Sequence, residues 1–465
     1  MAADAGAATM AAMIRCAALD ALRTRETARY RERHPRSAAL AAASAPHWLY
    51  GLPLHWMRDW PLPHPLFVQR AQGAELVCAD GHRLADFCLG DTAAMYGHAP
   101  PAVARAVAAQ AAAGFSAMLP GEALAEVGAL LAQVFGLPRW QLALSASDAN
   151  RFALRWARAV TGRPRVLVFD GCYHGTVDDT LVDLRADAGG RRRTVARASL
   201  LGQVHDPAAS TVAVPFNDLV AVEQALAGGD IACVLTEPAL TNCGLVPPAP
   251  GFIEGVQALA RAHGSLLVLD ETHTLSSGHG GWARVQGLVP DLLVVGKAVA
   301  GGVPCAVYGF GEDLAQRMEH ARAAAPAGHS GIGTTLAGGL LALAALRAML
   351  AEVMTPAAHE RMSQGAERLQ AGLQAVITDA GLPWSVTRLG ARMELQFRAA
   401  APRDAGEARA AMDDALAAAL HLAWLNRGVL VTPFHDMLLV SPQTTDEDIA
   451  AVPAALRSVL GELLA

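Results

Sequence analysis

Short apolar runs alternate with longer segments of helical pattern between about residues 101 and 345. The runs are 141–145, 165–169, 231–235, 265–270, 292–295 and 306–308. Strands that are apolar on both faces are typical of a parallel sheet covered by helices on both sides. The pattern therefore predicts an α/β fold with a mostly parallel sheet in the centre of the chain.

Both flanks of this segment have a different pattern. Residues 74–90 alternate between apolar and polar positions, with a turn signal at Asp80-Gly81, and this predicts a hairpin. After about residue 345 a long helix rich in Ala, Leu and Arg leads to a smaller α+β region. The elements expected there are strands at 392–397 and 429–431 and a final helix from Asp446.

Composition limits the class of protein. A chain of 465 residues with 53% hydrophobic and 17% charged residues is typical of a globular enzyme with two or three packed domains. The net charge of -6 argues against nucleic acid or an anionic membrane as a partner. The seven cysteines include no CxxC pair, so neither a metal site nor a disulfide framework is indicated. With no long apolar span either, we expect a cytoplasmic enzyme without a metal or a membrane contact.

Lys297 is the only lysine among 37 lysine and arginine residues, so the other 36 are arginines. Arginine serves as a surface cation but stays protonated, whereas a desolvated lysine can lose its proton and attack a carbonyl carbon. This lysine follows the apolar run 292–295 and Gly296, and precedes a turn of small residues with room for a flat ligand. We therefore interpret Lys297 as a chemical group rather than as a surface charge.

Asp270 ends the apolar run 265–270, 27 residues before Lys297. Open α/β sheets bind ligands beyond the carboxyl ends of their strands, where both residues are expected. A carboxylate at that place can keep a pyridine nitrogen protonated and make the ring an electron sink. A helix cap or a salt bridge is the alternative for a lone aspartate, and the lysine favours the cofactor.

The segment Ser145–Asn150 lies between a strand and a helix expected at 151–160. Small residues at a helix N-terminus expose backbone N–H groups to a phosphate, and Ser145 and Ser147 add hydroxyl donors. An ordinary capping box is the alternative, because Ser and Asp favour such positions anyway.

Two further segments follow apolar runs. Tyr173, which lies between Gly171 and Gly175, can lie flat against a ring, and His174 is either a second contact or a buried hydrogen-bonding histidine. Glu237 and Asn242 place an acid and an amide just beyond the run 231–235.

In order and spacing these segments resemble the motifs of class III (ω-type) pyridoxal-phosphate aminotransferases of fold type I. The most similar branch is that of glutamate-1-semialdehyde aminomutase. Seven segments correspond to family patterns. They are 145–150 (S-G-T-E-A-N), 173–175 (Y-H-G), 216–218 (Y-N-D), 237–248 (E-P-x-x-x-N-x-G-x-x-P-P), 270–272 (D-E-V), 296–304 (G-K-x-x-G-G-G-x-P) and 333–339 (G-T-x-S-G-N-P). The resemblance covers roughly residues 65–455. Ala146 replaces a glycine of the pattern, Thr272 replaces a valine, and the residues from His273 onward replace a hydrophobic-Gly-Phe-Arg segment.

The resemblance implies pyridoxal 5′-phosphate as the cofactor and a role for each matching residue. Lys297 would be the Schiff-base lysine and proton shuttle, and Asp270 would pair with the pyridine nitrogen. The other implied cofactor contacts are Ala146 and Ser147 at the phosphate, Tyr173 and Thr272 on opposite ring faces, His174 beside Tyr173, Glu237 and Asn242 near the ring hydroxyl, and Thr335 at the phosphate of the neighbouring subunit. A homodimer with shared active sites is therefore implied.

Three regions follow from the patterns and the resemblance together. They are an N-terminal helical arm with a substrate-side loop (1–70), a large cofactor-binding α/β domain (71–345, of which 71–100 packs with the small domain) and a C-terminal small α+β domain (346–465). The loop at 45–70 is dense in Pro, His and Trp, and is either a packing segment or a wall of the substrate site.

The leading interpretation is an aminotransferase that moves an amino group from a small-molecule donor to a carbonyl acceptor by a ping-pong mechanism. An aminomutase, epimerase or decarboxylase on the same scaffold is the alternative, and a non-catalytic binding protein is the third class. The mutase branch has a late acid tied to gating, and our alignment places His435 there. The glycine-rich composition of 273–281 also favours a site from which a product can leave, so both features favour the aminotransferase.

Overall fold

The structure is a computed structural model that describes residues 16–434 and 436–465. Contacts divide the chain into two compact units. One comprises 101–359 and 402–409, and the other comprises the described residues up to Pro100 together with 360–401 and 410–465. The domain boundaries expected from the sequence stay a prediction.

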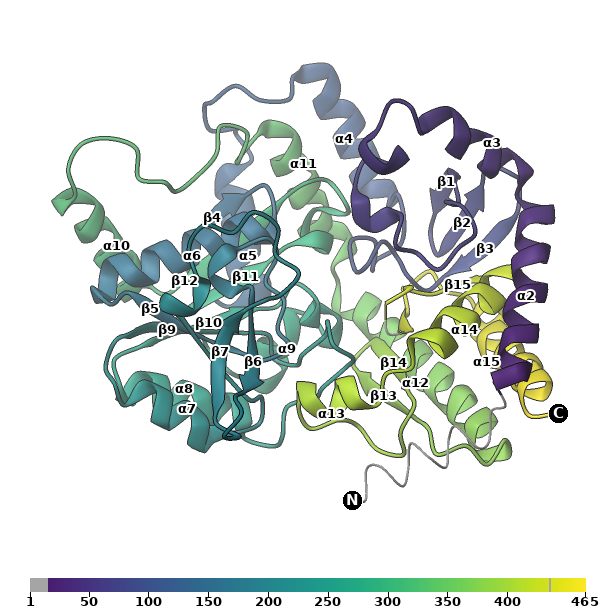
Figure 1. The fold of residues 1–465 in the computed structure, drawn as a ribbon. Helices are drawn as coiled ribbons and strands as arrows, with labels where there is room; N and C mark the ends of the chain where they lie inside the picture. The colour runs from purple at the N-terminus through teal and green to yellow at the C-terminus, as the bar shows by residue number, and fades with distance from the viewer. Residues whose placement is uncertain (1–15, 435) are drawn as a thin grey trace. The chain divides into compact units, whose positions relative to one another are not determined.

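The first unit is built on a seven-stranded sheet (Figure 1). Its strands, in spatial order, are β4 (Arg139–Ala143), β12 (Ala306–Phe310), β11 (Leu292–Val295), β10 (Leu266–Asp270), β9 (Ile231–Thr236), β5 (Arg165–Phe169) and β8 (Thr211–Val214). Strands β11, β10, β9, β5 and β8 pair in parallel, and β12 is antiparallel to both of its neighbours. The predicted fold class, with a mostly parallel sheet, is confirmed.

Helices cover this sheet because its central strands are buried along their whole length. Helix α6 packs against β4, β9, β10, β11 and β12, and α8 packs against β9 and β10. Figure 1 places α6 on one side of the strands and α7 and α8 on the other. The helices of this unit are α4 (Pro101–Ala113), α5 (Leu124–Phe135), α6 (Ala146–Thr161), α7 (Leu219–Leu226), α8 (Phe252–Ala262), α9 (Gly281–Gln286), α10 (Glu312–Ala324) and α11 (Leu340–Ala348), and α13 (Ala405–Ala410) begins in it.

Two elements of this unit were not expected from the sequence. The hairpin β6 (Val182–Ala186) and β7 (Arg192–Ala196) is largely exposed at its outer ends, so it lacks an apolar run. Strand β8, at the edge of the sheet, has only four residues.

The second unit contains two smaller sheets. One has the order β1 (Val68–Gln72), β2 (Glu75–Cys78), β3 (Arg83–Asp86), β15 (Val429–Leu430), and the other has the order β13 (Ser385–Leu389), β14 (Arg392–Gln396), β16 (Met437–Leu439). The β2–β3 hairpin turns at Gly81, whose φ of 83° suits glycine. The helices are α2 (Cys16–Arg33), α3 (Pro35–Ser44), α14 (Asp414–Asn426), α15 (Asp446–Leu463) and most of α12 (Pro356–Asp379).

The N-terminal part of the second unit joins its core through a few side chains. Leu22 of α2 is buried with residues of α12, α14 and α15, and Trp60 packs edge-on against the buried ring of His421 at 5.6 Å. Trp48 and Trp56 are exposed. The segment 45–70 is thus partly a packing segment, and its predicted role at the substrate stays a prediction. Among the described residues no single helix is long and apolar enough to cross a membrane, although 340–353 and 356–379 together meet that test.

Candidate active site

The candidate site lies along the edge of the seven-stranded sheet that is formed by the carboxyl ends of its parallel strands. Because β12 is antiparallel to both β11 and β4, the carboxyl ends of β4, β11, β10, β9 and β5 share that edge. The segments expected from the sequence to carry chemistry follow these strands directly, at Ser145, Asp170, Glu237, Asp270 and Lys297. The edge therefore brings together residues that are more than 150 positions apart in the chain.

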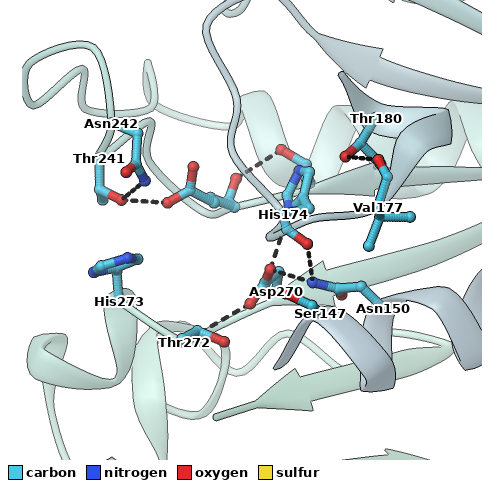
Figure 2. Close-up of polar contacts among 12 residues, drawn as sticks. Ser147, Asn150, His174, Val177, Thr180, Thr241, Asn242, Asp270, Thr272 and His273 are labelled. Carbon is cyan, nitrogen blue, oxygen red and sulfur yellow. Dashed lines mark hydrogen bonds and ion pairs between the residues drawn. The ribbon is translucent and has the colours of Figure 1, made fainter. Parts of the chain in front are cut away.

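Asp270 is the centre of a buried polar network (Figure 2). Its Oδ2 accepts hydrogen bonds from Asn150 Nδ2 at 2.8 Å and from His174 Nδ1 at 3.0 Å. Its Oδ1 accepts one from the backbone N–H of Thr272 at 3.1 Å. Asn150 Nδ2 also donates to the His174 carbonyl at 3.2 Å, which ties the helix α6 to the loop after β5.

This network keeps the Asp270 carboxylate charged. Burial alone would raise its pKa, but the hydrogen bond and charge of His174 and the bonds from Thr272 and Asn150 lower the pKa from 3.8 to about 2. Burial lowers the pKa of His174, but Cys172 and Asp270 outweigh that effect and raise it. The result is a buried, hydrogen-bonded ion pair at neutral pH with a fixed negative charge at the end of β10.

The N-terminus of helix α6 lies close to the loop that contains Gly175. Ser145 caps the helix by accepting a hydrogen bond from Asp148 N–H at 3.2 Å, and Ser147 Oγ accepts one from Thr176 N–H at 3.1 Å. Gly175 has a φ of +81°, and a Cβ there would lie 2.0 Å from Ser147 Oγ. Only glycine fits this contact, so the loop closes onto a 16-residue helix whose dipole favours an anion at this end.

Ala146, the alanine that replaces a glycine of the related pattern, lies against Gly296, the residue before the lysine. A Cβ on Gly296 would lie 2.7 Å from the Ala146 methyl group. The extra methyl group therefore occupies the space beside Gly296. Lys297 itself has a φ of +48°, an uncommon conformation for a residue with a side chain.

The ε-amino group of Lys297 contacts a histidine. Lys297 Nζ lies 2.9 Å from His273 Nε2, and the His273 side chain is buried. His273 is followed by the short helical turn η5 (Thr274–Ser277), most of which is buried. The glycine-rich composition of 273–281 does not extend to this turn, where apolar Leu275 and internally bonded hydroxyl groups fill the space, and the predicted product release stays a prediction.

Glu271 holds that turn in place. Its carboxylate accepts hydrogen bonds from Thr274 Oγ1 at 2.8 Å and from the backbone N–H groups of Trp282 and Ala283 at 2.7 and 2.6 Å. Burial raises the pKa of Glu271 to about 7, although these hydrogen bonds oppose the shift. Glu271 thus caps helix α9, while the adjacent Asp270 faces the network with His174.

The other predicted cofactor contacts fall in different surroundings. Glu237 is buried and accepts a hydrogen bond from Thr241 Oγ1, to which Asn242 Nδ2 also donates at 3.2 Å. The side chain of Tyr173 is 39% exposed, and Thr335 lies on an exposed turn. Thr272 Oγ1 is buried without a hydrogen-bond partner among the residues that the structure describes.

Sequence reasoning missed two residues of this site. Asn150 belongs to a quoted motif, but only the register of α6 shows that its amide points at Asp270. His273 begins the segment that differs from the family pattern, and its contact with Lys297 depends on the path of the turn that follows it. The signal available for both was an unusual polar residue within a few positions of a recognised motif.

His435, which is aligned with the gating acid of the mutase branch, lies outside the described residues.

Comparisons with known proteins agree on one family. The family described as Aminotransferase class-III matches residues 57–460. The chain is 36% identical to a glutamate-1-semialdehyde 2,1-aminomutase of Roseiflexus castenholzii, over 85% of this chain and 91% of that protein. It is 49% identical to the crystal structure of a glutamate-1-semialdehyde-aminomutase from Pseudomonas aeruginosa PAO1, with a TM-score of 0.92 over 97% of this chain and 100% of that one.

A second structure of that Pseudomonas aeruginosa protein carries a lysine-to-alanine substitution and is a complex with PMP. An omega-transaminase from Sphaerobacter thermophilus is also similar, at 28% identity and a TM-score of 0.84 over 93% of this chain and 99% of that one.

Proposed function

This chain belongs to the class III aminotransferase family, and on that premise we propose that it is an aminomutase acting on glutamate-1-semialdehyde. The observation that carries the proposal is the 49% identity over 97% of the chain to a glutamate-1-semialdehyde-aminomutase, against 28% to an omega-transaminase. The reaction would exchange the amino group on carbon 2 with the aldehyde oxygen on carbon 1. The product would be the isomer 5-amino-4-oxopentanoate.

The broad prediction of a pyridoxal-phosphate enzyme of class III is confirmed. The preference for transfer between two substrates has less support than its alternative, because relatives at 36% and 49% identity are aminomutases, against 28% for the omega-transaminase. The argument from residue 435 rested on a single aligned position, and the argument from the glycine-rich composition of 273–281 has less support where residues 274–276 are buried.

Pyridoxal 5′-phosphate is the cofactor, and the residues of the site fit it. The N-terminus of α6 with Ser147 would hold the phosphate, and the charged Asp270 would face the pyridine nitrogen. The buried Thr272 Oγ1 still has a hydrogen bond to give to a group that the described protein residues do not supply. Lys297 supplies the amine for a covalent link.

When bound, the cofactor supplies an electron sink next to the substrate carbon that loses a proton. Asp270 would hold the charge that this sink needs, and Asn150 and His174 would keep that carboxylate oriented. Lys297 Nζ would deliver a proton to carbon 1 of the substrate in one half-reaction and take a proton from carbon 2 in the other. The strained φ of Lys297 and the packing of Ala146 against Gly296 fix the backbone from which that side chain extends.

We propose a homodimer as the working unit. Thr335 is exposed on a turn, where a neighbouring subunit can reach it, and this supports its predicted contact with that subunit. Exposed apolar side chains lie in the same region, since Leu341 N–H donates to the Phe115 carbonyl and both Phe115 and Leu336 are more than half exposed. A second copy would cover them. Seven free thiols support a cytoplasmic location.

The test is turnover of glutamate-1-semialdehyde with no other amine or carbonyl compound present. We expect many molecules of 5-amino-4-oxopentanoate per active site, and none from Lys297→Ala. If turnover instead stops after one equivalent and resumes only when a carbonyl acceptor is added, the chain is an aminotransferase and the proposal is wrong.

A further inference from the structure

His273 contacts Lys297, and none of the roles assigned above includes it. Its Nε2 lies 2.9 Å from Lys297 Nζ, which is hydrogen-bond distance, and its side chain is only 5% exposed. It lies in the segment that differs from the family pattern to which this chain was compared, directly after Asp270, Glu271 and Thr272.

The scaffold fixes the backbone that carries this imidazole. The carbonyl of His273 accepts hydrogen bonds from Ser276 Oγ at 3.0 Å and from Ser276 N–H at 3.4 Å. Leu275 N–H donates to the Glu271 carbonyl at 2.9 Å, and the Glu271 carboxylate caps α9. The ring therefore starts from a turn that is bonded at both ends, and its contact with Lys297 does not depend on an exposed loop.

A lysine amine is protonated at neutral pH and must lose that proton before it can attack an aldehyde. We propose that His273 positions Lys297 in the enzyme without cofactor and accepts the proton from its ε-ammonium group. In this step an N–H bond at Lys297 Nζ breaks, an N–H bond at His273 Nε2 forms, and the positive charge moves to the imidazole. Nζ is left with a lone pair, ready for attachment. The proposal rests on Lys297 being the attachment residue.

The single lysine makes the first test direct. Protein grown with lysine labelled at Cε and Nζ gives one lysine side-chain signal in NMR spectra, that of Lys297. In the enzyme freed of cofactor, we expect His273→Gln to shift this signal. The matched control is His279→Gln, the same substitution in the same segment, which should leave the signal in place. An unchanged signal in His273→Gln overturns the contact.

The second test measures how fast the freed enzyme captures pyridoxal 5′-phosphate, by visible absorbance after mixing. Proton transfer by a positioned side chain typically contributes about 100-fold or more, so we expect capture at least about tenfold slower in His273→Gln and His273→Gly. Added imidazole should speed capture by His273→Gly, whereas equal ionic strength of sodium chloride should not. His279→Gly should show neither effect.

The outcomes separate the steps of the argument. Slow capture by His273→Gly without any gain from imidazole overturns proton transfer, and capture at the wild-type rate overturns the whole proposal. If His273→Gly does not fold, the His273→Gln rate decides, because its amide fills similar space but takes no proton. If borohydride reduction of the wild type leaves no cofactor on Lys297, the attachment assignment fails instead, whatever the NMR signal shows.

Discussion

Gly175 offers the sharpest test of where the cofactor phosphate binds. We consider Gly175→Ala, which places a methyl group on a backbone with a φ of +81°. The built Cβ lies 2.0 Å from Ser147 Oγ, 2.8 Å from Ser147 Cβ and 2.9 Å from Ser147 Cα. The last of these is backbone, so rotating the serine side chain does not relieve the clash and the first turn of α6 has to move.

Two terms make up the expected magnitude. A side chain in the left-handed region costs about 1–2 kcal/mol, and forcing an extra carbon into a packed contact costs about 1–3 kcal/mol. Gly162→Ala is the matched control, because Gly162 ends the same helix with a φ of +69° and has nothing within 4 Å of its built Cβ. It carries the first term without the second.

The packing term should appear as lost cofactor affinity. The chain without cofactor can relax by moving the turn, whereas a phosphate at the N-terminus of α6 needs the turn in place. The difference of about 1–3 kcal/mol corresponds to a dissociation constant roughly 5- to 150-fold weaker in Gly175→Ala than in Gly162→Ala.

The assay titrates cofactor into both variants in a Lys297→Ala background, so that no covalent link hides the phosphate contribution. Pyridoxal without its phosphate serves as the second ligand, and its affinity should be nearly equal in the two variants. Equal dissociation constants for pyridoxal 5′-phosphate, or the same loss with pyridoxal, would refute the placement of the phosphate.

Four further outcomes are expected, at three residues. Lys297→Arg keeps the charge but should lose all borohydride-stable cofactor, as mass spectrometry of the reduced protein can check, and near-normal turnover would contradict us. Asp270→Asn should slow proton removal from substrate by several orders of magnitude in single-turnover experiments. Folding lowers the pKa of Asp270 from 3.8 to about 2, so its carboxylate should add roughly 2 kcal/mol of stability. This stability is complete above about pH 4 and is lost as the pH falls through 2. The melting-temperature gap between wild type and Asp270→Asn should therefore close as the pH falls over that range. Thr335→Ala should release cofactor faster than wild type when the protein is diluted. Sedimentation measures the oligomeric state and absorbance measures the bound cofactor, and a fully active monomer would exclude the shared site.

The central sheet was predictable because its strands are buried on both faces and so read as short apolar runs. Strands β5 and β11 match the expected runs residue for residue, and β10 begins one residue later than expected. The β6–β7 hairpin was not predictable in this way, since its outer residues are exposed and Arg192 and Arg193 give it a polar sequence.

The site was predictable where a residue is fixed by its place at a strand end. Asp270 and Lys297 lie there, and neighbouring parallel strands bring them to one edge. The contact of His273 with Lys297 was not predictable, because it depends on a turn shaped by hydrogen bonds to Glu271. Helix register likewise decides that Asn150 reaches Asp270, and a motif match carries no such information.

The contact between Ala146 and Gly296 constrains the order in which these positions can change over evolution. With alanine at 146, any side chain at 296 meets the methyl group at about 2.7 Å, so position 296 is closed to substitution. With glycine at 146 the methyl contact is absent, and the nearest neighbour that remains is the backbone nitrogen of residue 146 at 3.2 Å. A lineage that acquired Ala146 therefore depends more strongly on Gly296 from then on, and a substitution at 296 is less costly after Ala146 is lost. The two positions are epistatic although 150 residues separate them in the chain.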